Sequence, residues 1–357
     1  MFRQARRITA IALAGLLFMA GHVMAKGFNN LSFMADYNTR HQTAIKVFLP
    51  FLEAAQKQFP GKLSFHFFGP QELFPDAEAW AVVTDGRADF GSVRPSAFPG
   101  KMNLLSVVAI PGVCPNAVVG SLVTQDLIDK FPEVRAELPP KTVPFVGWAS
   151  AAYQIHSIPE IRNVADIKGK KIIVWDATTL EYAKILGAVP VRMPAPDTYM
   201  ALSKGMADGV LCPLAPVRSI KITELAKNHL ILDLYVNTFV INANKELVNA
   251  MPKDMHDWIM AQGGIGMARN CGISLDDAAL ADTEWMKAQG HKFFTLTTEE
   301  RAEMLKPFAA VTERWKNVEC KGMNAEVVAR VYQYALERSK YHQKQMAEGA
   351  YGAQFKK

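Results

Sequence analysis

Polar and aromatic residues in this chain of 357 residues stand directly after short apolar runs. Arg94, the pair Trp175 and Asp176, and Cys212 each end or follow such a run, and Arg218 lies shortly after Cys212. A guanidinium pairs with anions, an indole offers apolar surface, and a carboxylate accepts hydrogen bonds. Residues of these types are suited to holding a small molecule by non-covalent contacts.

Patterns for catalysis are missing from the sequence. It contains no G-x-S-x-G elbow, no H-E-x-x-H pair and no Walker loop. Its eight histidines show no metal-ligand spacing. The glycines of 264–266 resemble a dinucleotide turn, but a helical pattern surrounds them and no strand precedes them. We therefore expect a protein that is not an enzyme and has no metal and no cofactor, with an exported enzyme on the same fold as the alternative.

The cysteines indicate no scaffold of disulfide bonds. Four cysteines are too few for such a scaffold, and they lack the C-x₂-C spacing of a zinc site. Cys271 and Cys320 are the two that an oxidising compartment would allow to pair.

The N-terminal segment predicts export. Arginines at positions 3, 6 and 7 precede an uncharged run at 8–20, and Val23-Met24-Ala25 follows as an A-x-A-like cleavage site. Thirteen residues rise only about 20 Å as a helix, less than the ~30 Å hydrocarbon core of a bilayer. We expect residues 1–25 to be a cleaved signal peptide and the mature protein to be periplasmic.

The composition is that of an ordinary globular protein. Half of the residues are hydrophobic and 21% are charged, which excludes a collagen-like or wholly disordered chain. Three of the six net positive charges belong to the predicted signal peptide, so the mature chain has no strongly basic character. Nucleic acid is therefore not an expected partner. The length suggests about two domains.

Short apolar strands alternate with amphipathic helices, which predicts an α/β fold. We expect strands at 31–34, 63–67, 88–93, 171–175, 189–193 and 209–211, and one long strand at 231–241. Helices are expected near 41–58, 76–86 and 179–186, from a cap at Asp197 or Thr198 to 206, and then at 258–269, 275–289, 299–316 and 325–346. Thr297 and Glu300 match a capping box at the third of these last helices. Open α/β sheets bind ligands at the carboxyl ends of their strands.

Several segments occur in an order that resembles the solute-binding proteins of tripartite ATP-independent periplasmic (TRAP) transporters, the DctP family. They are D-G-R-A-D-F-G at 85–91, D-I-K-G-K-K-I at 166–172, L-G-A-V-P-V at 186–191, D-T-Y-M-A-L at 197–202 and G-M-A-D-G at 205–209. Pro213 and Met251-Pro252 extend the pattern. The resemblance covers essentially the whole mature chain and is strongest in its middle third.

The resemblance implies a two-lobed α/β periplasmic binding fold with hinge strands and long C-terminal helices. In such a protein the lobes close over one small molecule, which is then delivered to a TRAP membrane permease. We expect lobe I to comprise 26–150 and 238–278, and lobe II to comprise 151–237 and 279–357. A monomer is expected. A periplasmic ligand-binding component of a sensory system is the alternative function.

The chain departs from the family at the positions that hold the ligand. Members usually carry an arginine, which pairs a carboxylate bidentately, where this chain has Ile173. A second arginine of some members is replaced by Tyr153, and a frequent asparagine by Cys212. Arg94 is our preferred substitute anion anchor, ahead of Arg218 and Arg192.

The remaining candidate contacts are aromatic or neutral. Tyr153 and Trp175 would bring ring surface to the ligand, and Asn237 would be a further contact. Asp176 would accept a hydrogen bond from the ligand or cap the helix that follows it. We therefore predict binding of a small organic solute, an organic acid in the first place, in a pocket more apolar than the family norm and open to an aromatic ligand.

Overall fold

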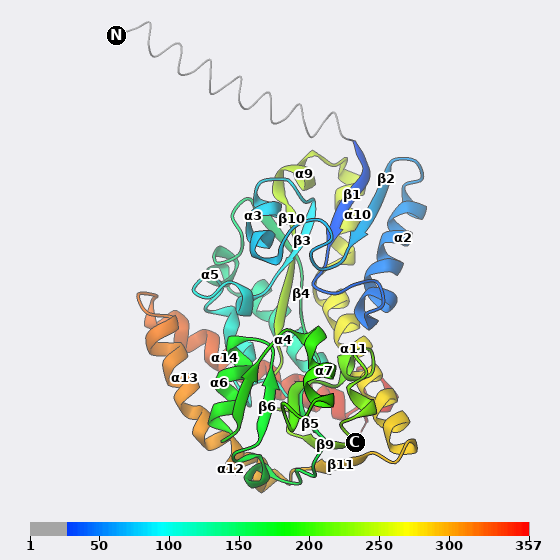
Figure 1. The fold of residues 1–357 in the computed structure, drawn as a ribbon. Helices are drawn as coiled ribbons and strands as arrows, with labels where there is room; N and C mark the ends of the chain where they lie inside the picture. The colour runs from blue at the N-terminus through cyan, green and yellow to red at the C-terminus, as the bar shows by residue number, and fades with distance from the viewer. Residues whose placement is uncertain (1–26, 357) are drawn as a thin grey trace, which may run out of the picture. The chain divides into compact units, whose positions relative to one another are not determined.

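The computed structural model describes residues 27–356 (Figure 1). The predicted signal peptide lies outside these residues. Within the described range, no helix combines the length and the apolar character needed to cross a membrane.

The chain divides into two compact units. Of the described residues, unit 1 contains 27–93, 139–145 and 241–263, and unit 2 contains 94–138, 146–240 and 264–356. These bounds differ from those expected from the sequence, because 94–138, 146–150, 238–240 and 264–278, expected in lobe I, belong to unit 2. The physical reason is helix packing, since α4 (Ala117–Lys130) is buried against α11 (Gly264–Ala288) and α14 (Ala325–Ala347).

Unit 1 is built on a five-stranded sheet with the order β2-β1-β3-β10-β4. The strands are β1 (Phe28–Met34), β2 (Leu63–Phe68), β3 (Phe90–Val93), β4 (Thr142–Ala149) and β10 (Thr238–Asn244). β4 and β10 run through residues of both units. β1 pairs in parallel with β2 and β3. The unit's helices are α2 (Leu49–Gln58), α3 (Ala79–Thr84), α9 (Lys245–Ala250) and α10 (Lys253–Gln262). Phe33 is surrounded by phenylalanine rings and forms the centre of this core.

Unit 2 contains a six-stranded sheet with the order β11-β9-β5-β8-β6-β7. Its strands are β5 (Tyr153–Ser157), β6 (Lys171–Val174), β7 (Val189–Arg192), β8 (Gly209–Pro213), β9 (Asn228–Ile231) and β11 (Lys292–Thr295). β5 is antiparallel to both of its neighbours, β8 and β9. Side chains alternate between the two faces of each strand. Ile172 and Val174 therefore join one core cluster, while Ile173 joins another.

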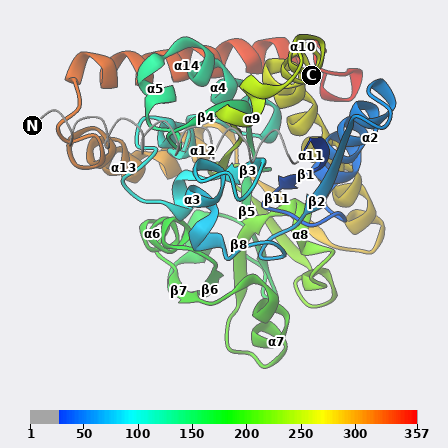
Figure 2. The same cartoon turned by 90° about the horizontal axis from the view of Figure 1, so that it is seen from above.

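Helices form the rest of unit 2. Besides α4, α11 and α14 they are α5 (Pro132–Ala136), α6 (Ala177–Ile185), α7 (Thr198–Ser203), α8 (Leu214–Val217), α12 (Thr298–Leu305) and α13 (Ala309–Arg314). Figure 2 shows the red helix α14 alongside α4, and the two helices are in contact.

Both units also contain short 3₁₀ or π turns. These turns occupy Ala44–Phe48, Asp76–Glu78, Pro95–Ala97, Leu105–Ala109, Val164–Ile167, Ala195–Asp197, Ile222–Glu224, Lys306–Phe308, Trp315–Glu319 and Ala353–Phe355.

The predicted long strand at 231–241 is wrong. β9 ends at Ile231 and β10 begins at Thr238, so residues 232–237 are not part of a strand. The side-chain carbonyl of Gln154 accepts hydrogen bonds from the backbone N–H groups of Leu232 (2.6 Å) and Asp233 (2.8 Å). Asp233 also has a φ of 42°, which a continuous strand does not allow. Hydrogen bonds to the Gln154 side chain thus take the place of backbone hydrogen bonds between strands, and the chain turns here.

The helical boundaries differ in detail from the prediction. The expected helices 258–269 and 275–289 are α10 and one continuous α11, which meet at Gly263. A Cβ atom at Gly263 would lie 2.3 Å from the carbonyl oxygen of Phe145, so a side chain has no room there. The expected helix at 299–316 is divided by a 3₁₀ turn that contains Pro307.

The structure decides two further predictions, the capping box at Thr297 and Glu300 and the pairing of Cys271 with Cys320. The capping box is confirmed, because the Glu300 N–H donates to the Thr297 hydroxyl (3.1 Å) and the Thr297 N–H donates to the Glu300 carboxylate (2.8 Å). The four cysteines are free and buried, so Cys271 and Cys320 do not pair in this structure.

Candidate functional site

All eight residues that were predicted from the sequence to bind the ligand belong to unit 2. Arg94 follows the carboxyl end of β3, as expected, and its extended backbone begins the 3₁₀ turn at Pro95–Ala97. Its side chain is half-buried. The other seven residues fall into separate environments.

Tyr153 and Asn237 are brought together. The Asn237 side-chain amide donates to the Tyr153 hydroxyl at 3.1 Å, and both residues are buried. The backbone of Asn237 is fixed as well, because its N–H donates to the Ser150 hydroxyl (3.0 Å) and its carbonyl accepts from the Ser150 N–H (2.8 Å). Asn237 is thus held at both its main chain and its side chain.

Tyr235, which the sequence analysis did not nominate, joins this pair. Its ring stacks on that of Tyr153 with centroids 4.3 Å apart and an angle of 23°. The ring of Tyr182 meets Tyr235 edge-on, with centroids 4.9 Å apart at 90°. We call Tyr153, Tyr182 and Tyr235 the tyrosine cluster. Its members come from β5, from α6 and from the segment between β9 and β10.

The hydroxyl of Tyr235 is a buried polar group for which residues 27–356 provide no hydrogen-bond partner of good geometry. Tyr182 donates its hydroxyl to the carbonyl of Ala109 (3.2 Å), and Tyr153 accepts from Asn237. The Tyr235 hydroxyl has no such bond among the described residues, although its side chain is fully buried. Burial, then the nearby Tyr153 phenol and Asp176 carboxylate, raise the pKa of Tyr235.

A polar network fixes the segment that carries Tyr235 and Asn237. The side-chain amide of Gln154 donates to the Asp233 carboxylate (2.7 Å) while its oxygen holds the backbone at 232 and 233. The Arg301 guanidinium from α12 donates to the other oxygen of the same carboxylate (3.0 Å). The partly buried Asp233 carboxylate is thus paired with both a side-chain amide and a guanidinium. The network therefore sets where Tyr235 and Asn237 lie.

Ile173 and Cys212 lie in a different environment. Both are fully buried in one apolar cluster with Val210, on the opposite face of the sheet from Tyr153 and Ile172. Burial raises the pKa of the Cys212 thiol. Trp175 packs against the same cluster, and its indole N–H donates to the Thr198 hydroxyl at 3.0 Å. The structure therefore does not join these three residues to the tyrosine cluster.

Asp176 and Arg218 have structural partners. Asp176 caps α6, where its carboxylate accepts from the Thr179 N–H at 2.7 Å within a capping box. Asp176 was expected either to accept a hydrogen bond from the ligand or to cap the helix that follows it, and the structure shows the capping role. Arg218 pairs with Asp282 at 3.3 Å and lies 4.4 Å over the Trp285 ring. Its exposed guanidinium is already occupied by these two neighbours.

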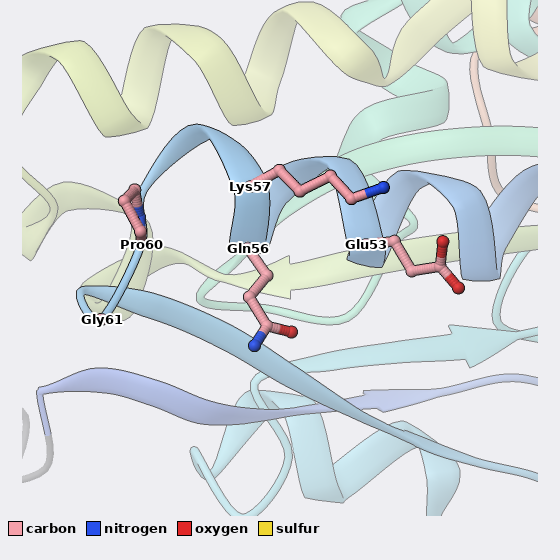
Figure 3. Close-up of a pocket in the computed structure, with 5 residues that line it drawn as sticks. All are labelled: Glu53, Gln56, Lys57, Pro60 and Gly61. Carbon is pink, nitrogen blue, oxygen red and sulfur yellow. The ribbon is translucent and has the colours of Figure 1, made fainter.

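A surface pocket of about 430 Å³ lies on unit 1, and none of the eight candidate residues lines it. Figure 3 shows its lining: Glu53, Gln56 and Lys57 project from α2, and Pro60 and Gly61 form the turn before β2. Most of these residues are exposed. No cluster of three or more potential metal ligands occurs within 27–356.

Comparison with known proteins identifies the class of protein. A two-unit α/β chain of this topology matches solved periplasmic solute-binding proteins. One is a TRAP solute-binding protein from Desulfovibrio salexigens, with a TM-score of 0.79, 22% identity, and coverage of 88% of this chain and 97% of that one. Another is a TRAP solute-binding protein from Rhodoferax ferrireducens in complex with benzoate, with a TM-score of 0.76, 22% identity and coverage of 88% and 98%. At this identity the likeness concerns the fold.

The sequence itself places the chain in a family. The model of bacterial extracellular solute-binding proteins, family 7 (DctP), matches residues 34–318, and the chain belongs to this family. The C4-dicarboxylate-binding periplasmic protein DctP of Rhodobacter capsulatus is 23% identical, over 72% of this chain and 78% of that protein. The chain matches only 20–38% of the length of several other curated relatives. The family assignment and the two-lobed α/β fold predicted from the sequence are confirmed.

Proposed function

We propose that this protein is the periplasmic receptor of a TRAP transport system and that it binds an aromatic or otherwise apolar monocarboxylic acid for delivery to the permease. Family membership supports the receptor role, since this family consists of extracellular solute-binding proteins. The observation that carries the ligand class is the tyrosine cluster with its unpartnered Tyr235 hydroxyl. A ligand that stacks on tyrosine rings and bonds that hydroxyl would complete the cluster.

The chemistry at Ile173 supports a ligand with a single carboxylate. A guanidinium pairs one carboxylate bidentately, and a fully buried isoleucine cannot, so this chain has one cationic partner fewer for a second carboxylate. Three solved proteins of similar fold hold acids with rings: the Rhodoferax protein holds benzoate, a Bordetella bronchiseptica protein holds mandelate, and a marine metagenome protein holds 3-hydroxybenzoate. A Shewanella oneidensis protein of this fold holds succinate instead. The ring-bearing ligands of the first three agree with the tyrosines of this chain.

Thermal denaturation with a panel of solutes tests this function. We expect benzoate, 3-hydroxybenzoate and mandelate to raise Tm in a saturable manner, because a ligand that binds only the folded state stabilises it. Succinate tests for a dicarboxylate site, and benzamide tests whether the carboxylate is needed. Stabilisation by succinate but by none of the aromatic acids would refute the ligand class. Turnover of a stabilising solute would refute the receptor role.

Arg94 is the arginine that we propose as the anion anchor. It is half-buried and directly follows the carboxyl end of β3, where open α/β sheets bind ligands. Arg94→Ala is expected to weaken binding of an aromatic carboxylate about tenfold, as expected for loss of a charge-assisted hydrogen bond. Calorimetric titration measures this effect.

The matched control for Arg94→Ala is Arg192→Ala, which removes the same charge from an exposed position at the end of β7. This control is expected to bind as the unmodified protein does. Equal affinities of both variants and the unmodified protein would show that Arg94 does not hold the ligand.

A further inference from the structure

Three histidines and a lysine form an unbroken line of hydrogen bonds in unit 2. His156 Nδ1 lies 2.8 Å from His229 Nδ1, and His229 Nε2 lies 2.8 Å from His291 Nδ1. At one end His156 Nε2 is 3.2 Å from the carbonyl oxygen of Cys212, and at the other His291 Nε2 is 3.1 Å from Lys227 Nζ. We call these four residues the histidine chain. His156 and His229 are fully buried and His291 is 6% exposed.

The sheet builds this line from three adjacent strands. His156 on β5 is the register partner of His229 on β9, and His291 immediately precedes β11, which pairs with β9. On the other side of His156, its register partner is Val210 on β8, and the register partner of Val210 is Ile173 on β6. The histidine chain therefore lies on the same face of the sheet as the Ile173 cluster, where the neighbours are apolar.

Both ends of the histidine chain set the same direction of donation. A carbonyl oxygen only accepts, so His156 must carry its proton on Nε2. A neutral His156 then accepts at Nδ1, which requires Nδ1–H on His229, and the same step requires Nδ1–H on His291. His291 Nε2 is left as an acceptor, facing an ammonium that only donates. Every bond is satisfied only when all three imidazoles are neutral and in these tautomers.

An added proton breaks one bond of this line. If His156 were protonated, its Nδ1–H would face the Nδ1–H of His229. If His229 were protonated, its Nε2–H would face the Nδ1–H of His291. In both cases two hydrogens would meet in a buried setting. Protonated His291 keeps its bond to His229 and conflicts only with Lys227, whose exposed ammonium is free to rotate outward. Lys227 keeps a second acceptor, the carbonyl oxygen of Thr223 at 2.7 Å.

We propose that the histidine chain is a proton-binding site with His291 as its entrance: acidification adds one proton from water to His291 Nε2, displaces the Lys227 ammonium, and leaves His156 and His229 neutral. The added proton thus releases Lys227 from His291 and leaves the hydrogen bonds that join β5, β9 and the segment leading into β11 in place. No bond other than N–H is made, and the charge of the unit rises by one.

The charged and titratable groups around the histidine chain favour its neutral form. Lys227 faces His291 directly. The Lys287 ammonium of α11 lies 5.9 Å over the Phe293 ring, which packs on His229, and it is paired with the Glu284 carboxylate at 2.9 Å. The Cys212 thiol of β8 is neutral because burial raises its pKa. Burial lowers the pKa of His156 to about 4, and burial together with His156, His291 and Lys227 lowers that of His229 to about 2. Burial and then Lys227 lower the pKa of His291.

Imidazole ¹⁵N NMR of the protein as a function of pH tests this proposal. At pH 7.5 we expect the Nε2–H tautomer for His156 and the Nδ1–H tautomer for His229 and His291. On acidification His291 should become doubly protonated first, while the other two keep their tautomers. A different tautomer at any of the three positions, or earlier protonation of His156 or His229, would overturn the proposal.

Two lysine variants complete the test. Lys227→Met removes the ammonium at the entrance and should raise the titration midpoint of His291 by about one pH unit, which is a tenfold higher proton affinity. Lys287→Met removes a neighbouring ammonium that makes no bond to the histidine chain, and it should leave the midpoint within a few tenths of a unit. Equal shifts in the two variants would show that general charge, rather than the Lys227 contact, controls the site.

Discussion

Replacement of Tyr235 by phenylalanine is expected to stabilise the ligand-free protein and to weaken ligand binding at the same time. The Tyr235 hydroxyl is fully buried and has no hydrogen-bond partner among the described residues. A buried unpaired hydroxyl costs about 1–3 kcal/mol, so its removal should raise the free energy of unfolding by about 1 kcal/mol. If the ligand supplies the missing partner, the same change should lower affinity tenfold or more.

Tyr182→Phe is the matched control, because both residues are buried members of the tyrosine cluster. The Tyr182 hydroxyl donates to the carbonyl of Ala109, so its loss should lower the free energy of unfolding by about 1 kcal/mol. Affinity for an aromatic acid should stay unchanged in this control. Urea unfolding and calorimetric titration measure the two quantities. A Tyr235→Phe protein that binds as tightly as the unmodified one would remove Tyr235 from the proposed site.

Sequence patterns predicted the fold well where strand and helix alternate. β1, β2, β3, β6, β7 and β8 lie within a few residues of their expected positions, because each is a short apolar run next to a glycine, proline or polar turn. β5 was missed because its sequence Y-Q-I-H-S mixes polar side chains into a fully buried strand. α4 was missed because nearly all of its residues are buried, so the one-sided periodicity of an amphipathic helix is absent.

The candidate site was predictable only in part. Tyr153 and Asn237 were nominated and do meet, although they are 84 positions apart. Tyr235 was overlooked because 231–241 resembled one strand, and the Gln154 bonds that turn the chain there leave no local signal. Ile172 and Ile173 are both apolar, so the sequence alone does not tell which face of β6 each occupies. The register of the sheet decides that question.

The largest effect on stability is expected at a glycine on α11. A Cβ atom at Gly272 would lie 2.5 Å from the Cα atom of Val118 and 2.8 Å from the carbonyl oxygen of Ala117, so α4 approaches α11 backbone to backbone. α4 has little freedom to retreat, because Asp276, one turn along α11, accepts from the N–H groups of Ala117 (3.1 Å) and Val118 (2.9 Å). Gly272→Ala should therefore lower the free energy of unfolding by about 3 kcal/mol.

Gly266→Ala is the control within the same helix. An added Cβ at Gly266 meets nothing within 4 Å, and alanine is favoured over glycine in a helix by up to about 1 kcal/mol. The control should thus be neutral or slightly more stable, while Gly272→Ala loses stability. Urea unfolding followed by circular dichroism separates the two outcomes. Equal stability of the two variants would mean that α4 and α11 adjust at little cost, and the backbone contact at Gly272 would then not determine how this pair of helices packs.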